Sequence, residues 1–249
     1  MDAPIFYALP QDIVGDDIRL DKDELHHASK VMRLSVGSQV IVIDGQGMAY
    51  RGELTSLDGR SSNHVRCHST IRNLGETMVH LTLASGLSTG HKFDSVVQKG
   101  TELGVKRFVP ILAHKSKAKL DNHRRAEKRL TRLEKVALAA AKQSRRSFVP
   151  QISHPMSVSE FIEQTDETGL NLIFHPSRGN QLNQELESVG DVRQVSLLVG
   201  PESGFTDEEV EAALGRGFRP VSLGNRVLRT ETAGPVVCAL VLNQLGEMS

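Results

Sequence analysis

The chain has 249 residues, of which 39% are apolar and 24% charged, with 30 Lys and Arg against 30 Asp and Glu. This composition is ordinary for a globular protein and excludes a fibrous or largely disordered chain. No apolar run approaches the ~20 residues of a membrane span, the N-terminus lacks the pattern of a secretory signal, and the two cysteines fit neither a metal site nor a disulfide framework. We therefore expect a cytoplasmic protein of one large or two small domains, without membrane segment or metal.

The charges are unevenly distributed along the chain. Residues 91–146 contain 16 Lys and Arg against 5 Asp and Glu, whereas residues 151–219 contain 4 against 12. Binding of a polyanion depends on the local potential, so a net charge of zero does not exclude a nucleic acid partner. The alternative is an ordinary solvated helix face, and the charge pattern alone favours neither.

The first 72 residues have the pattern of a small β-rich domain. One helix is expected from Asp23 to about residue 34, because Leu25, Ala28 and Met32 have helical spacing. Asp21 or Asp23 could cap that helix. Short strands, tight turns and one helix favour a small barrel or sandwich. The predicted strands are residues 5–9, 40–44, 48–54 and 64–71, with turns at 45–47 and 58–59.

Strands and helices alternate beyond a boundary near residues 72–78. This alternation predicts an α/β fold around a mainly parallel sheet that is covered on both faces. Pro110 interrupts one strand and favours an edge or a bulge there. We therefore divide the chain into domains 1–72 and 73–249. The predicted strands of the second are 79–84, 108–112, 170–174, 194–199 and 220–223, and its helices about 93–103, 122–144, 157–164, 207–214 and 233–245.

The helix expected at residues 122–144 is strongly basic. Contacts from its cations to phosphates would release counterions and supply affinity for a nucleic acid without sequence preference. Its apolar stripe, which should face the sheet, consists of Ala126, Leu130, Leu133, Ala137 and Ala140. Its cations are Arg124, Arg125, Lys128, Arg129, Arg132 and Lys135, and the run is extended by Lys115, Lys117, Lys119, Arg145 and Arg146.

Two strand–loop–helix units near the C-terminus favour a ligand site. The strand at 194–199 leads into GPESGF, residues 200–205, and the strand at 220–223 leads into GNRVLRTETAG, residues 224–234. Open α/β sheets bind ligands at the carboxyl ends of their strands, and glycine lets a ligand approach the main chain. A plain helix start, with Thr206 as cap and Glu209 closing a capping box, is the alternative for the first loop. A plain helix start does not explain the second loop, where Arg226, Arg229 and Glu231 lie close together, as binding and catalytic residues on loops often do.

Motifs of several common enzyme classes are absent. The sequence has no GxGxxG, HExxH or GxSxG, and GLSTGHK at residues 86–92 lacks the spacing of a phosphate-binding loop. We interpret that segment as a strand-to-helix turn. His26 and His27 are adjacent on a helix and face different ways, so a shared metal is not expected.

At the two loops the sequence resembles the RsmE-type ribosomal RNA methyltransferases of the SPOUT superfamily. Ser203 departs from the pattern, since the family commonly has glycine there, and we expect this small side chain to be tolerated. The resemblance follows the family's order and spacing over nearly the whole chain. Its segments are GPESGFTDEEV, SLGNRVLRTETA, HHASKVMRLSVGSQVIVIDGQG, KFDSVVQKGTELGVKRFVPILAHKS and AAKQSRRSFVP.

The resemblance implies a fold, a cofactor and a substrate. The fold would be an α/β SPOUT methyltransferase domain, a parallel sheet with a C-terminal trefoil knot, joined to an N-terminal PUA-like β-barrel that binds RNA. The cofactor would be S-adenosylmethionine. The substrate would be one uridine of small-subunit (16S) ribosomal RNA in the ribosomal subunit, methylated at N3 by a homodimer. The exact nucleotide, and whether free RNA or the assembled subunit is used, stay open.

Candidate residues follow for the cofactor and for RNA. Main-chain groups at glycines and apolar side chains would surround the adenine, and the strand end at residues 174–176 would line the methionine. The cofactor candidates are Phe174, His175, Leu198, Gly200, Pro201, Glu202, Gly204, Leu223, Gly224, Val227, Leu228 and Thr232. The RNA candidates are Lys30, Arg33, Arg51, Arg124, Arg125, Lys128 and Arg132.

Methylation at N3 of uridine requires loss of the N3 proton and stabilisation of the resulting anion. A cation beside O2 or O4 would stabilise the anion, and a carboxylate within hydrogen-bond reach could take the proton. Arg229 and Glu231 are the first catalytic candidates, Arg226 is next, and Glu202 is a weaker candidate for the base. The alternative is that Arg229 and Glu231 pair with each other, or across a dimer, and only hold the loop.

Two other functions fit the same residues. A related knotted methyltransferase could modify another atom, such as a ribose hydroxyl, and nucleoside analysis would separate the two. A non-catalytic RNA-binding or assembly module would need no cofactor, so a thermal shift with S-adenosylmethionine would distinguish it. The last helix is apolar nearly all round, which requires burial on several sides, within one chain or against a second subunit.

Overall fold

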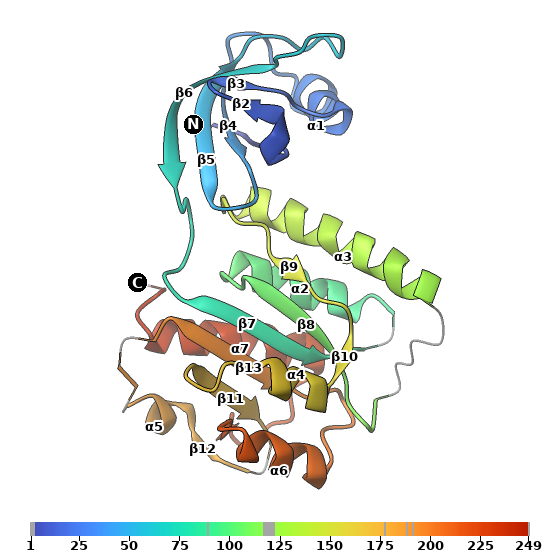
Figure 1. Ribbon diagram of the computed structural model, residues 1–249, viewed down its shortest axis with the longest axis vertical. Coiled ribbons are helices and arrows are strands. Elements are labelled where there is room, and N and C mark those ends of the chain that lie inside the picture. Colours follow the sequence, from blue (N-terminus) through green and yellow to red (C-terminus); the bar gives the residue numbers. More distant parts are fainter. Residues whose placement is uncertain are drawn as a thin grey trace. The chain divides into compact units, whose positions relative to one another are not determined.

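The computed structural model describes residues 3–88, 90–116, 123–176, 178–187, 189–190 and 192–248. The chain forms two compact units (Figure 1), one of Met1–Glu76 with Leu138–Val149 and the other of Thr77–Ala137 with Pro150–Ser249. The first unit therefore includes a segment that is far from residues 1–76 in the sequence. Lys117, Lys119 and residue 122 of the predicted basic helix lie outside the described residues.

The first unit contains a six-stranded sheet with the order β1-β4-β5-β6-β3-β2, which Figure 1 shows curled. β1 is parallel to β4, and the other neighbours are antiparallel. β5 has the predicted bounds, whereas β2 and β3 are too short to show an alternating pattern in the sequence. The strands are β1 (Ile5–Tyr7), β2 (Ile13–Val14), β3 (Asp17–Ile18), β4 (Gln39–Ile43), β5 (Met48–Leu54) and β6 (Val65–Arg72).

The helix of the first unit differs in part from the prediction. α1 (Lys22–His26) is capped by Asp21, whose side chain accepts a hydrogen bond from the Glu24 N–H at 2.8 Å. A π-helical turn, His27–Val31, continues it and ends with the Met32 N–H donating to the His27 carbonyl. Leu25 and Ala28 are buried as predicted, but Met32 is 41% exposed. The wider turn shifts the helical phase, which takes Met32 out of the apolar face.

The second unit is built on an eight-stranded sheet with the order β10-β8-β7-β13-β11-β14-β12, and β9 also pairs with β8. All its strand pairs are parallel, which confirms the predicted α/β class. β11 and β13 have the predicted bounds. The strands are β7 (His80–Gly86), β8 (Arg107–Leu112), β9 (Gln151–Ile152), β10 (Met156–Ser157), β11 (Leu170–Phe174), β12 (Asn180–Gln181), β13 (Gln194–Val199) and β14 (Arg219–Ser222).

The remaining helices agree with the predicted pattern, with one addition and one extension. α5 was not predicted, and α7 begins at Thr230, so Glu231 and Thr232 lie in its first turn and not in the preceding loop. The predicted capping box at Thr206 and Glu209 is present. The helices are α2 (Lys92–Glu102), α3 (His123–Gln143), α4 (Val158–Gln164), α5 (Leu182–Leu186), α6 (Asp207–Gly215) and α7 (Thr230–Gln244).

Pro110 does not mark an edge strand, because β8 has neighbours on both sides. Within β8, Pro110 pairs with Ser85 of β7. On the other side, β9 pairs with Arg107 and Phe108, and β10 pairs with Ile111 and Leu112. Proline cannot donate a ladder hydrogen bond, and its position falls in the gap between these two short strands.

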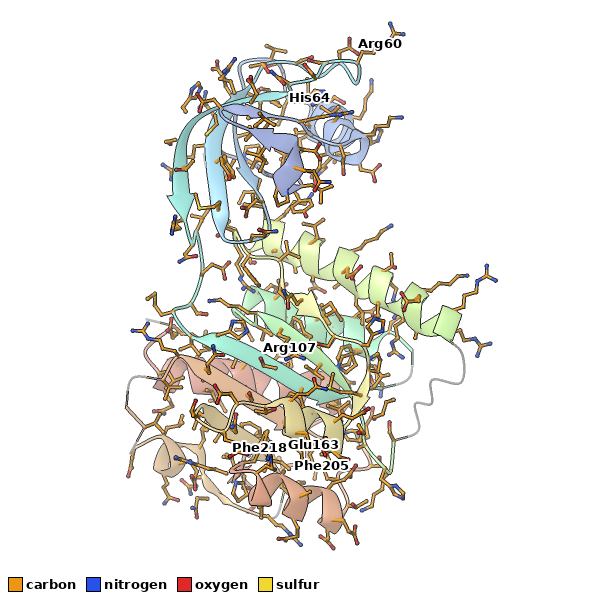
Figure 2. The ribbon with its side chains drawn as sticks, viewed as in Figure 1. Arg60, His64, Arg107, Glu163, Phe205 and Phe218 are labelled. Carbon is orange, nitrogen blue, oxygen red and sulfur yellow. The ribbon has the colours of Figure 1, made fainter. Side chains whose placement is uncertain are left out.

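Helices cover both faces of the sheet. Leu198 belongs to a core cluster with Phe161 of α4 and Val210 of α6, and the cluster includes Phe205 and Phe218 (Figure 2). Leu83 faces the other way, since its Cδ2 lies 3.3 Å from where a Cβ on Gly234 of α7 would be. α7 is buried at Val237, Cys238, Val241 and Leu242, whereas Leu240 is 42% exposed.

α3 carries the predicted apolar stripe. Leu130, Leu133, Ala137 and Ala140 are buried, and the division between the two units falls within this helix. No helix among the described residues combines the length and the apolar character that crossing a lipid bilayer requires.

Candidate functional site

A cavity of about 270 Å³ lies where β11, β13 and β14 end. These strands are neighbours in the parallel sheet, so the loops that follow them meet at the same edge. Most of the predicted cofactor residues line the cavity, together with two of the catalytic candidates. They are Phe174, His175, Gly200, Pro201, Glu202, Gly204, Leu223, Gly224, Val227 and Leu228, with Arg226 and Arg229.

Glycine main chain forms part of the cavity wall. Gly204 and Gly224 have φ values of +70° and +89°, a left-handed region that other residues rarely adopt. A Cβ on either residue would have no atom within 4 Å, so open space lies in front of both. The Gly204 N–H donates to the Pro201 carbonyl at 2.8 Å and closes a tight turn. A ligand can therefore reach the main chain of both loops.

Leu198 and Thr232 are not among the residues that line the cavity. Leu198 is fully buried in the core cluster under α4 and α6, because alternate strand positions point to opposite faces. Val199, the next residue of β13, lines the cavity instead. Thr232 is exposed in the first turn of α7, and its N–H donates to the Arg229 carbonyl at 2.8 Å.

Four charged side chains gather beside the cavity. Lys92 Nζ donates to Glu202 Oε1 at 2.9 Å. This hydrogen bond and the charge of Glu202 raise the pKa of Lys92, and the charge of Glu231 raises it further while that of Arg229 lowers it. Glu231 does not line the cavity, and its Oε2 is buried without a hydrogen-bond partner among the described residues.

Lys92 is a site residue that the sequence pattern did not predict. Residues 86–92 connect β7 to α2 as expected, and Gly86 at their start lies against the loop after β13. A Cβ on Gly86 would be only 2.3 Å from the Pro201 nitrogen, so this approach requires glycine. The pairing of β7 with β13 brings the two loops together, and strand order cannot be read from local pattern.

His175 occupies the loop after β11. Its pKa is lowered, mainly because burial disfavours the charged imidazolium, and the charges of Arg178 and Lys115 act in the same direction. Arg178 ties this loop to α6 through ion pairs to Asp207 at 2.7 Å and Glu211 at 2.9 Å. The neutral ring of His175 therefore lines the cavity from an anchored loop.

Two protein-family models match the chain. The RNA methyltransferase domain model matches residues 75–242, and the RNA methyltransferase PUA domain model matches residues 20–62. The ribosomal RNA small subunit methyltransferase E of Synechocystis sp. is 31% identical over 96% of this chain and 76% of its own length. The chain belongs to the ribosomal RNA small subunit methyltransferase E family.

Other relatives are similar over much of the chain. The methyltransferase E of Bacillus subtilis is 32% identical over 85% of this chain and 84% of its own. The crystal structure of the methyltransferase E of Neisseria gonorrhoeae, bound to S-adenosyl methionine, superposes with a TM-score of 0.85 at 28% identity, covering 97% of this chain and 98% of that one. The predicted family, enzyme class and PUA-like N-terminal domain are confirmed.

Ser203, the expected departure from the family pattern, is not directed at the ligand space. Its hydroxyl donates to the Lys115 carbonyl at 2.7 Å, and Ser203 is not among the cavity's lining residues. Lys115 in turn donates through Nζ to the Phe205 carbonyl at 3.1 Å. The serine therefore ties this family loop to the residues after β8.

The RNA candidates are exposed, with one exception. Lys30, Arg33 and Arg51 are exposed in the first unit, as are Arg124, Arg125 and Lys128 on α3. Arg132 instead donates to Asp94 Oδ1 at 2.8 Å and to His91 Nδ1 at 2.8 Å, with 37% of its side chain exposed. Its guanidinium therefore also links α3 to α2. In the part of the chain that is described, no group of three or more His, Cys, Asp or Glu could hold a metal.

Proposed function

We propose that the protein transfers a methyl group from S-adenosylmethionine to N3 of a uridine in small-subunit ribosomal RNA. The observation that carries this proposal is the cavity at the ends of β11, β13 and β14, which has glycine main chain in its wall and Arg226 and Arg229 among its lining residues. Family membership supports the RNA substrate, and the bound cofactor of the N. gonorrhoeae relative supports S-adenosylmethionine.

The cavity suits the chemistry of this cofactor. Adenine carries no charge, so main-chain groups and apolar side chains are fitting partners for it. Gly204 and Gly224 face open space, and Leu223 and Leu228 add apolar surface. The volume of about 270 Å³ is near the lower end of the roughly 300–1,000 Å³ of small-molecule sites. When bound, S-adenosylmethionine supplies an electrophilic methyl group.

The charged cluster supports the proposed roles in N3 methylation. Arg229 lines the cavity and would stabilise the uridine anion as the N3 proton leaves. Glu231, whose Oε2 has no partner in the described residues, is our candidate for the base; because Glu231 does not line the cavity, this role requires its side chain to turn toward the uridine. Glu202 lines the cavity but already accepts a hydrogen bond from Lys92, whose role would be to hold that carboxylate in place.

RNA would be held mainly through its phosphates, by exposed cations of α3 and of the first unit. Such a substrate implies a cytoplasmic protein. We also propose the homodimer and the trefoil knot that are typical of the family. Exposed apolar side chains near the C-terminus support a dimer contact, since Leu240 is 42%, Met248 49% and Met78 68% exposed. The Met78 N–H donates to Glu247, which brings Met78 close to the end of the chain.

Nucleoside analysis of the modified RNA tests the proposed function. Small ribosomal subunits from a strain without the protein are incubated with the enzyme and S-adenosylmethionine, and the nucleosides are identified by mass spectrometry. We expect N3-methyluridine, and a thermal shift of the protein with S-adenosylmethionine alone. A ribose-methylated product would indicate the related enzyme type. No product and no thermal shift would indicate an RNA-binding or assembly module.

A further inference from the structure

A second cavity lies entirely within the first unit and shares no residue with the first one. Its volume is about 320 Å³, within the range of roughly 300–1,000 Å³ that is usual for small-molecule sites. Its walls carry two carboxylates, Asp12 and Asp21, and two cations, Arg19 and Lys22. The proposed methyl transfer uses none of these residues.

The rest of the wall is apolar or aromatic. Leu20 and Leu25 are buried, and His64 is 1% exposed. His64 Nδ1 accepts from the Leu20 N–H at 3.1 Å, so Nε2, which lies 3.1 Å from the Asp58 carbonyl, carries the proton and donates. Both ring nitrogens are engaged, which fixes the orientation of the His64 ring in the wall. Figure 2 shows Arg60 extending away from the unit, and Arg60 does not line the cavity.

The charged groups of this cavity are available to a ligand. Asp21 uses Oδ1 to cap α1, whereas the carboxylate of Asp12 has no hydrogen bond within the described residues. Arg19 and Lys22 are exposed, and neither has an ion pair in the described part of the chain. Carboxylates repel an anion, but they accept hydrogen bonds from N–H groups. Arg19 and Lys22, which are cations, would attract phosphates that lie just outside the cavity.

An unpaired nucleotide fits this combination of groups. Its base is flat and uncharged, carries N–H donors on one edge, and is flanked by phosphates. Guanine presents two neighbouring donors, N1–H and the N2 amino group, which match the two oxygens of one carboxylate, whereas uracil presents only N3–H. We propose that this cavity holds an unpaired guanine of the RNA substrate, with Asp12 accepting from both donors and with Arg19 and Lys22 beside the flanking phosphates. The proposal rests on the proposed function only in taking RNA as the substrate.

Base preference in RNA binding tests this site. The full chain is titrated, at one salt concentration, with labelled oligouridines that carry one central guanine, one central inosine or no substitution, and fluorescence anisotropy is measured. We expect the guanine RNA to bind about tenfold more tightly than oligouridine, as one bidentate pair predicts. Inosine lacks the N2 amino group and should lose most of that advantage. Equal binding of all three RNAs would overturn the proposal.

Asp12→Asn and a matched control locate the preference. An amide cannot accept from both guanine donors, so Asp12→Asn should abolish the preference for guanine. Asp23→Asn makes the same charge change at an exposed residue outside the cavity and should keep it. A preference that survives Asp12→Asn would overturn the assignment. Thermal unfolding of both variants checks that they fold.

Arg19→Gln tests the phosphate side of the site. The variant should bind all three RNAs more weakly and to the same extent, and its slope of log affinity against log salt should be smaller. An unchanged slope would exclude Arg19 as a phosphate contact. The thermal shift with S-adenosylmethionine is measured in parallel. Absence of that shift in the unmodified protein would count against the proposed methyl transfer, whereas absence of the guanine preference counts against this cavity alone.

Discussion

Gly224 contributes to the cavity through its main chain. Its φ of +89° is unfavourable for a residue with a Cβ, and the strain of such a conformation costs about 1–3 kcal/mol. We expect Gly224→Val to reduce S-adenosylmethionine affinity in calorimetry at least tenfold, because the side chain would enter the open space and the loop would move. Gly200→Val should also reduce the affinity, for a different reason: a Cβ there would lie 3.3 Å from the ring of Phe205, so the loop would have to shift.

Gly217→Val is a matched control for this prediction. Gly217 has a φ of +79° and open space around it, but it does not line the cavity. The variant should lose stability by a similar amount and keep its cofactor affinity. If both variants bind S-adenosylmethionine like the unmodified protein, Gly224 is not part of the cofactor site.

Glu231 and Glu202 make different contacts, so their glutamine variants should behave differently. A general base typically contributes about 10²–10⁴-fold to a rate. We expect Glu231→Gln to lose methyl transfer on that scale at neutral pH and to recover in part as the pH rises, because hydroxide can then take the N3 proton. Glu202→Gln breaks the contact with Lys92 and should lose activity without recovery at high pH.

The pH profile of methyl transfer, measured with saturating cofactor, checks this prediction. A pH-independent decrease in Glu231→Gln, together with weaker cofactor binding, would show that Glu231 only supports the first turn of α7.

At the scale of the element, α3 combines a buried apolar stripe with an exposed basic face. Arg125 and Lys128 are exposed and have no ion pair in the described residues, whereas Arg132 is held by Asp94. Reversing Arg125 and Lys128 to Glu should weaken RNA binding and reduce the slope of log affinity against log salt by about 0.7–0.9 for each phosphate that the protein no longer neutralises. Cofactor affinity should not change.

Two other variants separate this effect from general charge. Lys99→Glu makes the same type of change at an exposed position of α2 and should leave the salt slope nearly unchanged. Arg132→Glu removes the link between α3 and α2, so it should also lower thermal stability. An unaltered salt slope after reversal of Arg125 and Lys128 would exclude this face of α3 from RNA binding.

At the scale of the whole molecule, a buried ion pair joins the two segments of the first unit. Arg146 Nη2 lies 2.8 Å from Glu76 Oε2, and both side chains are 2% exposed. Glu76 also accepts from the Phe148 N–H at 2.9 Å. Glu76→Gln would remove the carboxylate that Arg146 and the Phe148 N–H share, and breaking a buried ion pair costs about 3–5 kcal/mol. We expect the unfolding midpoint to fall by on the order of 10 °C.

An exposed pair of the same unit is the control. Arg66 and Asp17 lie 3.2 Å apart, with side chains 50% and 33% exposed. Such a pair contributes about 0–1 kcal/mol, so Asp17→Asn should change the midpoint only slightly. Equal effects of the two variants in calorimetry would show that burial does not strengthen the Glu76 contact.

Local pattern was sufficient for much of the fold. Runs such as residues 170–174 and 194–199 are rich enough in apolar residues to identify strands, the turn at 45–47 identifies 48–54 as a returning strand, and Thr206 with Glu209 identifies a helix start. The glycines of the two C-terminal loops likewise predicted the cavity, because the conformational freedom of glycine is a local property of the sequence. In each case the physical cause, side-chain period or backbone freedom, acts within a few residues.

Tertiary structure alone decided the features that depend on residues far apart in the sequence. Pairing of β7 with β13 brings Lys92 to Glu202, and strand register turns Leu198 into the core while Val199 lines the cavity. Residues 138–149 complete the first unit only because the chain returns to it. The second cavity likewise forms because His64 and Leu20 meet across the first unit. Sequence pattern reports neighbours along the chain, whereas these sites are made by neighbours in space.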